Sequence, residues 1–315
     1  MESRAQLKQL NVDLVTPNPE NPRLIFRQEE MDSLLISIKK YEVQVPISVY
    51  KKGEGYVLID GERRWRTSKK LNLSTIPAII QSAPSPLDNL LMMFNIHALR
   101  ENWDLFTIAN KITTVIQLLT VKFGYKPNEV QLSEETGLTR GTIRRCRLLI
   151  DLPSRFKQLI LKELEKPKSK QKLTEDFFIE METALKTVKN NFPEIINDQI
   201  DQVRDNLINK YKSGVIKNIV DFRKIAKIAT SPRNVEYPYN DAKTALITIF
   251  GEEKSGIEQV FNATVSELYG EKKLISNFTN VLYYVQNLSI EEREDKDIQE
   301  TLYNLKVAIE KVLNN

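Results

Sequence analysis

One stretch decides the fold: Tyr56-Val57-Leu58-Ile59-Asp60-Gly61-Glu62-Arg63-Arg64-Trp65-Arg66. Its apolar start predicts a strand, and the residues after Gly61 predict a helix. Glycine lets the backbone approach a ligand closely, and the free N–H groups at the start of a helix favour an anion. Arg63 and Arg66 share a helix face, with Arg64 about 100° around, and arginine pairs well with phosphate oxygens. Taken alone, these features fit a charged surface helix slightly better than a phosphate site.

The flanking sequence predicts a small mixed α/β domain over the first hundred residues. Leu14–Arg23 contains three prolines, so an extended loop is expected there. Apolar residues recur on one face of Glu29–Tyr41, which predicts a helix. The other expected elements are strands at Ile47–Tyr50, Tyr56–Ile59 and Ile76–Ile80 and a helix at Glu62–Leu71.

Two motifs carry a resemblance to a known family. Gly61-Glu62-Arg63-Arg64-Trp65-Arg66-Thr67 closely resembles the GERRxRA signature of the ParB family, with Thr67 in place of alanine. Upstream, Asn18-Pro19-Glu20-Asn21-Pro22-Arg23 resembles that family's NPxxPR element. The resemblance implies a ParB/sulfiredoxin-like domain that binds a cytidine nucleotide. The nucleotide-binding residues that it implies are Arg23, Gly61, Glu62, Arg63 and Arg64.

The sequence departs from the family pattern in two ways. Sulfiredoxin needs a cysteine near this turn, whereas the single cysteine, Cys146, lies far downstream. In the family's ENxxR element, Asn95 matches the asparagine, but Phe94 replaces the glutamate and Arg100 comes two residues late. Glu101-Asn102 is the alternative pair, without an arginine at the right spacing. We therefore expect CTP as the cofactor, with Asn95 among its contacts and Mg²⁺ as a possible companion, and weak hydrolysis or none.

A second motif lies between Glu129 and Arg147, where the sequence predicts two short helices around Gly137. Leu132, Leu138 and Ile143 are spaced to pack these helices together. Taken alone, a helical hairpin with a solvated basic face explains the segment equally well. The segment also resembles the helix-turn-helix of ParB proteins, with Ser133 where alanine is usual.

The second of these helices has the residues that a recognition helix needs, namely donors near its start for base edges and others for phosphates. Thr139 is expected to cap it, and Cys146 to pack on its inner face. The expected DNA-binding residues are Thr139, Arg140, Thr142, Arg144, Arg145 and Arg147.

The rest of the chain predicts helices without a catalytic constellation. Polar Lys166–Lys172 is the expected linker, and a second break is expected at Ser231–Pro238. Helices are expected at Glu175–Asn191, Glu194–Lys212 and Val215–Ala229, with at least three more before Leu313. Two apolar stripes are interpreted as core rather than binding surface. They are Phe177, Phe178, Met181 and Leu185, and Leu274, Phe278, Val281, Leu282 and Val285.

Composition narrows the chemistry. The 315 residues include 46 basic and 42 acidic ones, so the net charge of +4 is too small to prove a nucleic-acid partner. With one cysteine and one histidine, His97, the chain has neither an intrachain disulfide nor enough Cys/His ligands for a zinc site. No metal site is expected, and no apolar run is long enough for a membrane span. We expect a cytoplasmic, nucleoid- or plasmid-associated protein.

These observations predict an α+β protein with three domains. Residues 1–100 form the expected ParB/sulfiredoxin-like nucleotide-binding domain, residues 101–165 an all-α helix-turn-helix domain, and residues 173–315 an all-α and possibly oligomerising domain. The leading hypothesis is sequence-specific binding of double-stranded DNA, regulated by CTP, in DNA partition or gene regulation. The expected partners are a second copy of the chain and a ParA-type ATPase. The alternatives are a nuclease or nucleotide hydrolase, and a transcription regulator whose nucleotide site has lost its function.

Overall fold

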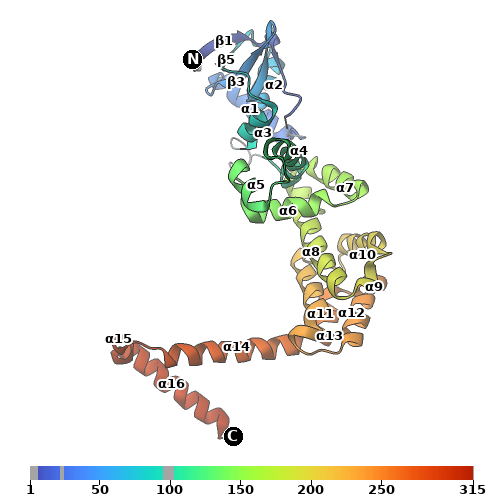
Figure 1. The fold of residues 1–315 in the computed structure, drawn as a ribbon, viewed down its shortest axis with the longest axis vertical. Helices are drawn as coiled ribbons and strands as arrows, with labels where there is room; N and C mark the ends of the chain where they lie inside the picture. The colour runs from blue at the N-terminus through green and yellow to red at the C-terminus, as the bar shows by residue number, and fades with distance from the viewer. Residues whose placement is uncertain (1–5, 22–24, 95–102, 315) are drawn as a thin grey trace. The chain divides into compact units, whose positions relative to one another are not determined.

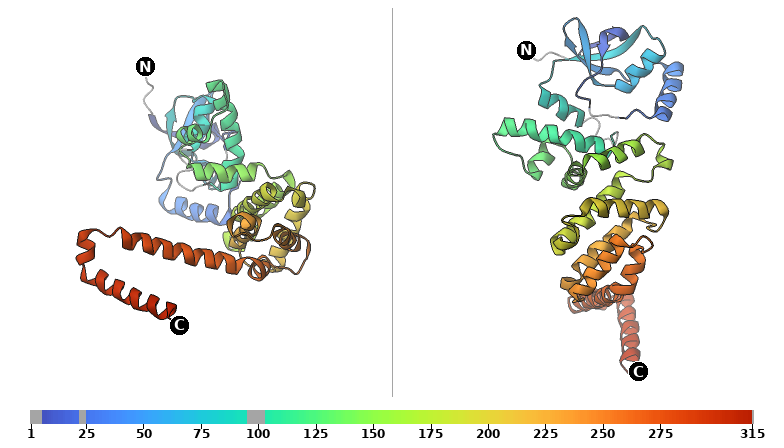
Figure 2. Two further views of the ribbon diagram at one scale, coloured as in Figure 1. Left: turned by 60° about the horizontal axis from the view of Figure 1, so that its bottom comes forward. Right: turned by 90° about the vertical axis from the view of Figure 1, so that its right-hand side faces the viewer.

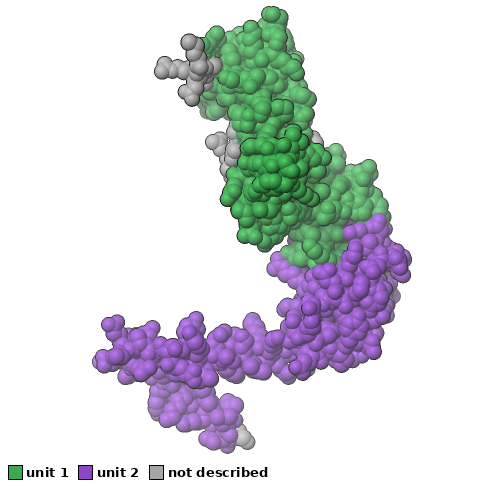
Figure 3. All heavy atoms as spheres, viewed as in Figure 1, with its two compact units in different colours: residues 1–186 green, residues 187–315 purple. Residues whose placement is uncertain are grey.

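The computed structural model describes residues 6–21, 25–94 and 103–314. The chain divides into two compact units, residues 1–186 and residues 187–315 (Figure 3). The first contains a mixed sheet followed by helices, and the second contains helices (Figures 1 and 2). The α+β class expected from the sequence is therefore confirmed. Within the described ranges, no helix is both long and apolar enough to cross a membrane.

The sheet of the first unit has the strand order β1-β5-β3-β4-β2 over its described residues. Strand β3 (Ile47–Lys52) lies between β5 (Thr75–Gln81), to which it is parallel, and β4 (Gly55–Asp60), to which it is antiparallel. Edge strand β1 (Gln6–Asn11) runs antiparallel to β5, and β2 (Val15–Thr16) runs parallel to β4. A 3-10 turn, η1 (Val12–Leu14), joins the two edge strands.

Two helices accompany the sheet, α1 (Gln28–Tyr41) and α2 (Glu62–Lys70), and they pack on each other. The core beneath them includes Ile47, Val49, Leu58 and Ile76. Trp65 of α2 is buried there, and its indole N–H donates to the carbonyl of Val12 at 3.1 Å. Because tryptophan has both a large apolar ring and one donor, this contact fixes the rotation of α2 about its axis.

The three strands predicted at Ile47–Tyr50, Tyr56–Ile59 and Ile76–Ile80 are confirmed, each one to two residues longer at an end. Strands β1 and β2 were not expected. In β1 only Leu10 is buried, so the strand lacks the alternating apolar pattern that identifies a half-buried strand. The short β2 lies inside the segment that was expected to be a loop.

The remaining helices of the first unit follow the sheet. They are α3 (Pro86–Met93), α4 (Leu105–Phe123), α5 (Glu129–Thr136), α6 (Arg140–Ile150) and α7 (Ser154–Leu164). The expected linker Lys166–Lys172 contains the 3-10 turn η3 (Lys168–Lys170), and its last backbone N–H donates to the carboxylate of Glu163 at 2.9 Å. Helix α8 (Glu175–Asn191) has the predicted bounds and includes the unit boundary. The predicted domain limits at 100, 165 and 173 stay predictions.

The second unit differs from the expected helices at two places. The helix expected at 194–212 is interrupted, giving α9 (Pro193–Ile196) and α10 (Ile200–Ser213). The helix expected at 215–229 starts later, because the side chain of Asn218 accepts the N–H of Val220 and holds the 3-10 turn η4 (Ile219–Asp221) before α11 (Phe222–Asn234).

The expected break at Ser231 was placed too early, because α11 continues through Pro232 to Asn234. Proline cannot donate to the carbonyl four residues back. The hydroxyl of Ser231 donates to that carbonyl, Ile228 O, at 2.8 Å, and so replaces the missing bond. The helices that follow are α12 (Tyr239–Gly251), α13 (Ile257–Thr264), α14 (Ser266–Gln286), α15 (Ile290–Glu294) and α16 (Lys296–Leu313).

Candidate functional site

The turn between β4 and α2 requires glycine for two reasons. Gly61 has a φ of 95°, in the left-handed region that side chains disfavour. A Cβ atom there would lie 2.6 Å from Cγ2 of Ile47, which is fully buried. The carboxylate of Asp60 accepts the N–H of Gly61 at 2.6 Å and fixes the turn. Gly61 precedes α2 and has no side chain to cap the first N–H groups of the helix, which are the groups that favour an anion.

The three arginines of α2 take different directions. Arg63 donates to the carbonyl of Glu30 at 3.0 Å and forms an ion pair with its carboxylate at 3.3 Å. Arg64 donates to the carbonyls of Val45 and Pro46, each at 2.5 Å, and to Asp60 at 2.9 Å. Arg64 therefore anchors the segment before β3 in this structure.

Glu62 is buried and orients its neighbours. One of its carboxylate oxygens accepts Nε and Nη2 of Arg66 at 2.8 and 2.6 Å, and the other accepts the side-chain amide of Asn21. The guanidinium of Arg66 also lies 4.3 Å from the ring centroid of Phe26. Among the arginines of α2, Glu62 therefore pairs with Arg66.

The structure brings the two family motifs together. The contact between Asn21 and Glu62 joins the NPxxPR loop to the first turn of α2. Asn18 is also buried, where its amide donates to Asn89 at 3.2 Å and its oxygen accepts the N–H of Glu20 at 3.0 Å. The predicted nucleotide contacts Arg23 and Asn95 lie outside the described residues. The roles predicted for Gly61, Glu62, Arg63 and Arg64 stay predictions.

A polar cavity of about 420 Å³ lies on the Arg63 side of α2. Its lining contains as many cations as carboxylates. Arg27 pairs with Asp104 at 2.7 Å and with Glu30 at 3.3 Å. Its charged lining residues are Arg27, Glu30, Arg63, Asp104, Lys168 and Glu175. The Nε atoms of Arg27 and Arg63 are buried and have no hydrogen-bond partner among the described residues. The cavity can therefore hold a polar ligand with acceptor groups.

Helices α5 and α6 form the predicted helix-turn-helix. Gly137 ends α5 with a φ of 72°, and the carbonyl of Ser133 accepts its N–H at 2.9 Å. The hydroxyl of Ser133 donates to Leu138 O across the turn at 2.6 Å, so serine is compatible with this position. The predicted packing residues are all buried, namely Leu132, Leu138, Ile143 and Cys146. Burial raises the pKa of the Cys146 thiol to about 12, as expected for a packing residue rather than a reactive one.

The predicted DNA-binding residues lie along α6. Thr139 caps the helix, because its hydroxyl accepts the N–H of Thr142 at 3.1 Å, and the two hydroxyls lie 2.9 Å apart. The side chains of the four arginines are between 41% and 59% exposed. Arg145 pairs with Asp176 of α8, whereas the other three gather around one acid, Glu129.

Three functional acids were not predicted from the sequence: Asp60 and Glu129, which pair with predicted site residues, and Glu175, which lines the cavity beside Arg63. Burial raises the pKa of Glu175 to about 7, although its carboxylate accepts the N–H of Phe106 at the start of α4. Glu129 had a usable signal, because Asn128 and Gln131 form a capping box that fixes the start of α5. The pairings with α6 are tertiary contacts and have no local signal.

Comparisons with known proteins point to one family. Residues 1–95 match the model of the ParB N-terminal domain. A probable chromosome-partitioning protein ParB from Campylobacter jejuni is 33% identical over 156 residues, which cover 49% of this chain and 53% of that protein. The chain thus spans about half the length of that relative.

A nucleoid occlusion protein from Geobacillus sp. is 29% identical over 249 residues, which cover 68% of this chain and 84% of that protein. Among solved structures, the chain is similar to a C-terminally truncated ParB from Caulobacter crescentus complexed with CTP-gamma-S. That match has 21% identity and a TM-score of 0.29, and it covers 56% of this chain and 92% of the other.

Proposed function

We propose that the chain is a sequence-specific DNA-binding protein that acts in chromosome or plasmid partition, because residues 1–95 match the ParB N-terminal domain and a chromosome-partitioning protein ParB is 33% identical over 156 residues. The observation that carries this proposal is the α5–α6 pair. Its second helix is capped by Thr139 and presents Arg140, Arg144, Arg145 and Arg147 with exposed side chains. A rigid helix with polar donors at its start and arginines along it is suited to the major groove.

The same proposal includes control by a nucleotide, namely CTP. The first N–H groups of α2 follow Gly61, which has no side chain that could cap them. These features fit a phosphate group. We also propose that Mg²⁺ can accompany the bound nucleotide, coordinated by its phosphate oxygens.

A partition role implies two protein partners. One is a second copy of the chain, for which the apolar helices α14 and α16 provide a surface. The other is a ParA-type ATPase, which the family resemblance implies. We place the protein on the nucleoid or on a plasmid, in keeping with DNA as its ligand.

The test of DNA binding uses duplexes selected from a random pool by the wild-type chain. Replacing Arg140, Arg144 and Arg145 together with alanine is expected to abolish selective binding. Each lost base contact costs about 1–3 kcal/mol. The control replaces three exposed lysines of the N-terminal domain, Lys39, Lys51 and Lys52, with alanine and keeps selectivity. Unchanged affinity of the arginine variant in an anisotropy titration would contradict the proposal. Metal-dependent cleavage of a plasmid by the wild-type chain would favour the nuclease alternative.

A further inference from the structure

One carboxylate lies among three of the arginines on α6. Glu129 is the first residue of α5, and its side chain is 22% exposed. One of its oxygens accepts Nε of Arg144 at 2.9 Å and lies 3.9 Å from Nε of Arg140. The other accepts Nη1 of Arg147 at 3.0 Å. The acid therefore holds two guanidinium groups by direct hydrogen bonds and lies close to a third.

The spacing along α6 explains why these side chains converge. Arg140, Arg144 and Arg147 are separated by four and then three residues, which places them on one helix face. The capping box of Asn128 and Gln131 fixes where α5 begins, and so it fixes Glu129 opposite that face. Arg145 lies on another side of α6 and pairs with Asp176 instead.

We infer that Glu129 is a specificity-determining residue of the proposed DNA site, which discriminates against duplexes that offer only phosphates. The inference rests on the proposed DNA-binding function and deepens it. A phosphate on any duplex offers these arginines the kind of charge-assisted bond that they already make to Glu129. Exchanging the carboxylate for a phosphate therefore adds little to the free energy of binding, and non-specific binding stays weak.

A base edge is different, because it can bind without displacing the acid. Arg144 uses Nε for its hydrogen bond to Glu129, and a guanidinium has two further nitrogens that carry donors. Arginine recognises guanine by two parallel donors to O6 and N7. A side chain held by a carboxylate loses less rotamer freedom when it makes that contact. Glu129 thus lowers affinity for phosphates and preserves affinity for the selected sequence.

The experiment compares Glu129→Gln with Glu135→Gln in the full chain. Glu135 is on the same helix and forms an ion pair too, but with Lys122 of α4 at 3.3 Å. Both variants remove one negative charge from α5, so any difference between them reports the contact with α6. Each is titrated with the selected duplex and with a scrambled duplex at several salt concentrations.

For Glu129→Gln, the affinity for the scrambled duplex should rise about tenfold, the size expected from freeing two exposed ion pairs. The dependence of log K on log salt should become steeper by about 1 to 2, one for each arginine that gains a phosphate. Affinity for the selected duplex should stay constant or fall, so that the ratio of specific to non-specific affinity drops at least tenfold. Glu135→Gln should leave that ratio and the salt slope near wild-type values.

A further variant separates the loss of the Glu129 contacts from a loss of folding. Glu129→Asp keeps the acid at the helix start but shortens it by one methylene, so it should give the same loss of selectivity with an intact α5. Equal ratios for the wild type, Glu129→Gln and Glu129→Asp would overturn the inference while leaving the proposed function in place. Failure of the wild-type chain to select any duplex would overturn both.

Discussion

At the scale of single residues, Gly61 has a left-handed backbone conformation that alanine disfavours. It also has no Cβ atom, which alanine would add. Gly61→Ala is expected to destabilise the fold by about 2–4 kcal/mol, from left-handed strain and from the clash with Ile47. It should also abolish nucleotide binding, because relief of that clash moves the first turn of α2. Chemical denaturation and calorimetry with CTP, ATP, GTP and UTP in magnesium measure the two effects.

Gly53 is a matched control for this change. Its φ of 62° is also left-handed, but a Cβ atom there meets no atom within 4 Å. Gly53→Ala should cost only about 1–2 kcal/mol of strain and leave nucleotide binding intact. For the wild-type chain we expect CTP binding with little or no phosphate release in the presence of the selected DNA. If none of the four nucleotides binds to the wild-type chain, the proposed nucleotide control is wrong.

Residue roles were predictable where one motif carries both the chemistry and the local structure. Glycine at the start of α2, Thr139 as a cap and Cys146 as a packing residue all follow from neighbours in the sequence. The directions of the α2 arginines do not, because Arg64 finds its acceptors at Val45 and Pro46 and Arg63 finds its partner in Glu30. Those contacts depend on how α1 and β3 pack against α2, which a single sequence does not encode locally.

At the scale of elements, two adjacent acids, Glu175 and Asp176, join three helices. Glu175 starts α8, accepts the N–H of Phe106 at the start of α4, and is followed by Asp176, which pairs with Arg145 of α6. Burial raises the pKa of Glu175 from its ordinary value of 4.5 to about 7, despite the hydrogen bond from Phe106. The acid is therefore protonated more readily in the folded chain than in the unfolded one.

This shift predicts the sign of a pH dependence. The folded state binds the proton of Glu175 more tightly than the unfolded state does. The contribution of Glu175 to the free energy of unfolding should therefore be highest below about pH 4.5. It should fall by up to about 3 kcal/mol as the pH rises to 7, and stay level above that. Glu175→Gln keeps an acceptor for Phe106 and removes the titration.

The measurement is urea unfolding of the wild-type chain and Glu175→Gln between pH 4.5 and 8. The difference between the two free energies should change across this window in favour of the variant at high pH. Glu165→Gln alters an exposed carboxylate and is expected to follow the wild type throughout. Parallel pH profiles for wild type and Glu175→Gln would contradict a titration of this group.

At the scale of the whole molecule, the sequence predicted the first unit much better than the second. The stripe of α8 is buried as expected, with Phe177, Phe178 and Met181 fully covered. The stripe of α14 was also interpreted as core, and that interpretation is wrong. No residue of α14 is buried, and Phe278 is 63% exposed. The same periodicity results whether a helix packs inside its own chain or against another one, so the sequence did not distinguish them.

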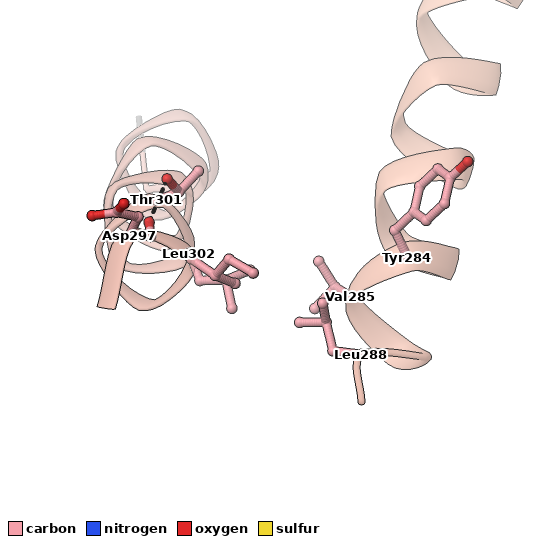
Figure 4. A pocket seen from close by; sticks show the side chains of 7 residues that line it. Tyr284, Val285, Leu288, Asp297, Thr301 and Leu302 are labelled. Carbon is pink, nitrogen blue, oxygen red and sulfur yellow. Dashed lines mark hydrogen bonds between the residues drawn. The ribbon is translucent and has the colours of Figure 1, made fainter. Parts of the chain in front are cut away.

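The apolar faces of α14 and α16 have the spacing of a coiled coil. Residues recur at intervals of four and three on both helices. They are Leu274, Phe278, Val281 and Val285 on α14, followed by Leu288 just after its end, and Ile298, Leu302, Leu305, Ile309 and Val312 on α16. Val285, Leu288 and Leu302 line a pocket of about 250 Å³, and Figure 4 shows Val285 and Leu288 pointing toward Leu302 across it. Farther along α16, Val312 is 76% exposed.

Exposed apolar faces of this length favour self-association. Each apolar side chain that a second copy buries contributes about 1.5–3 kcal/mol to the free energy of association. We expect the full chain to sediment as a dimer at micromolar concentration. The double variant Phe278→Asp/Ile309→Asp should be monomeric with an unchanged circular dichroism spectrum, since charges on these faces remove the gain from burial without touching a buried core residue. Val121→Asp alters another exposed apolar residue, on α4, and should remain dimeric. A wild-type chain that stays monomeric at high micromolar concentration would show that these helices are covered in some other way.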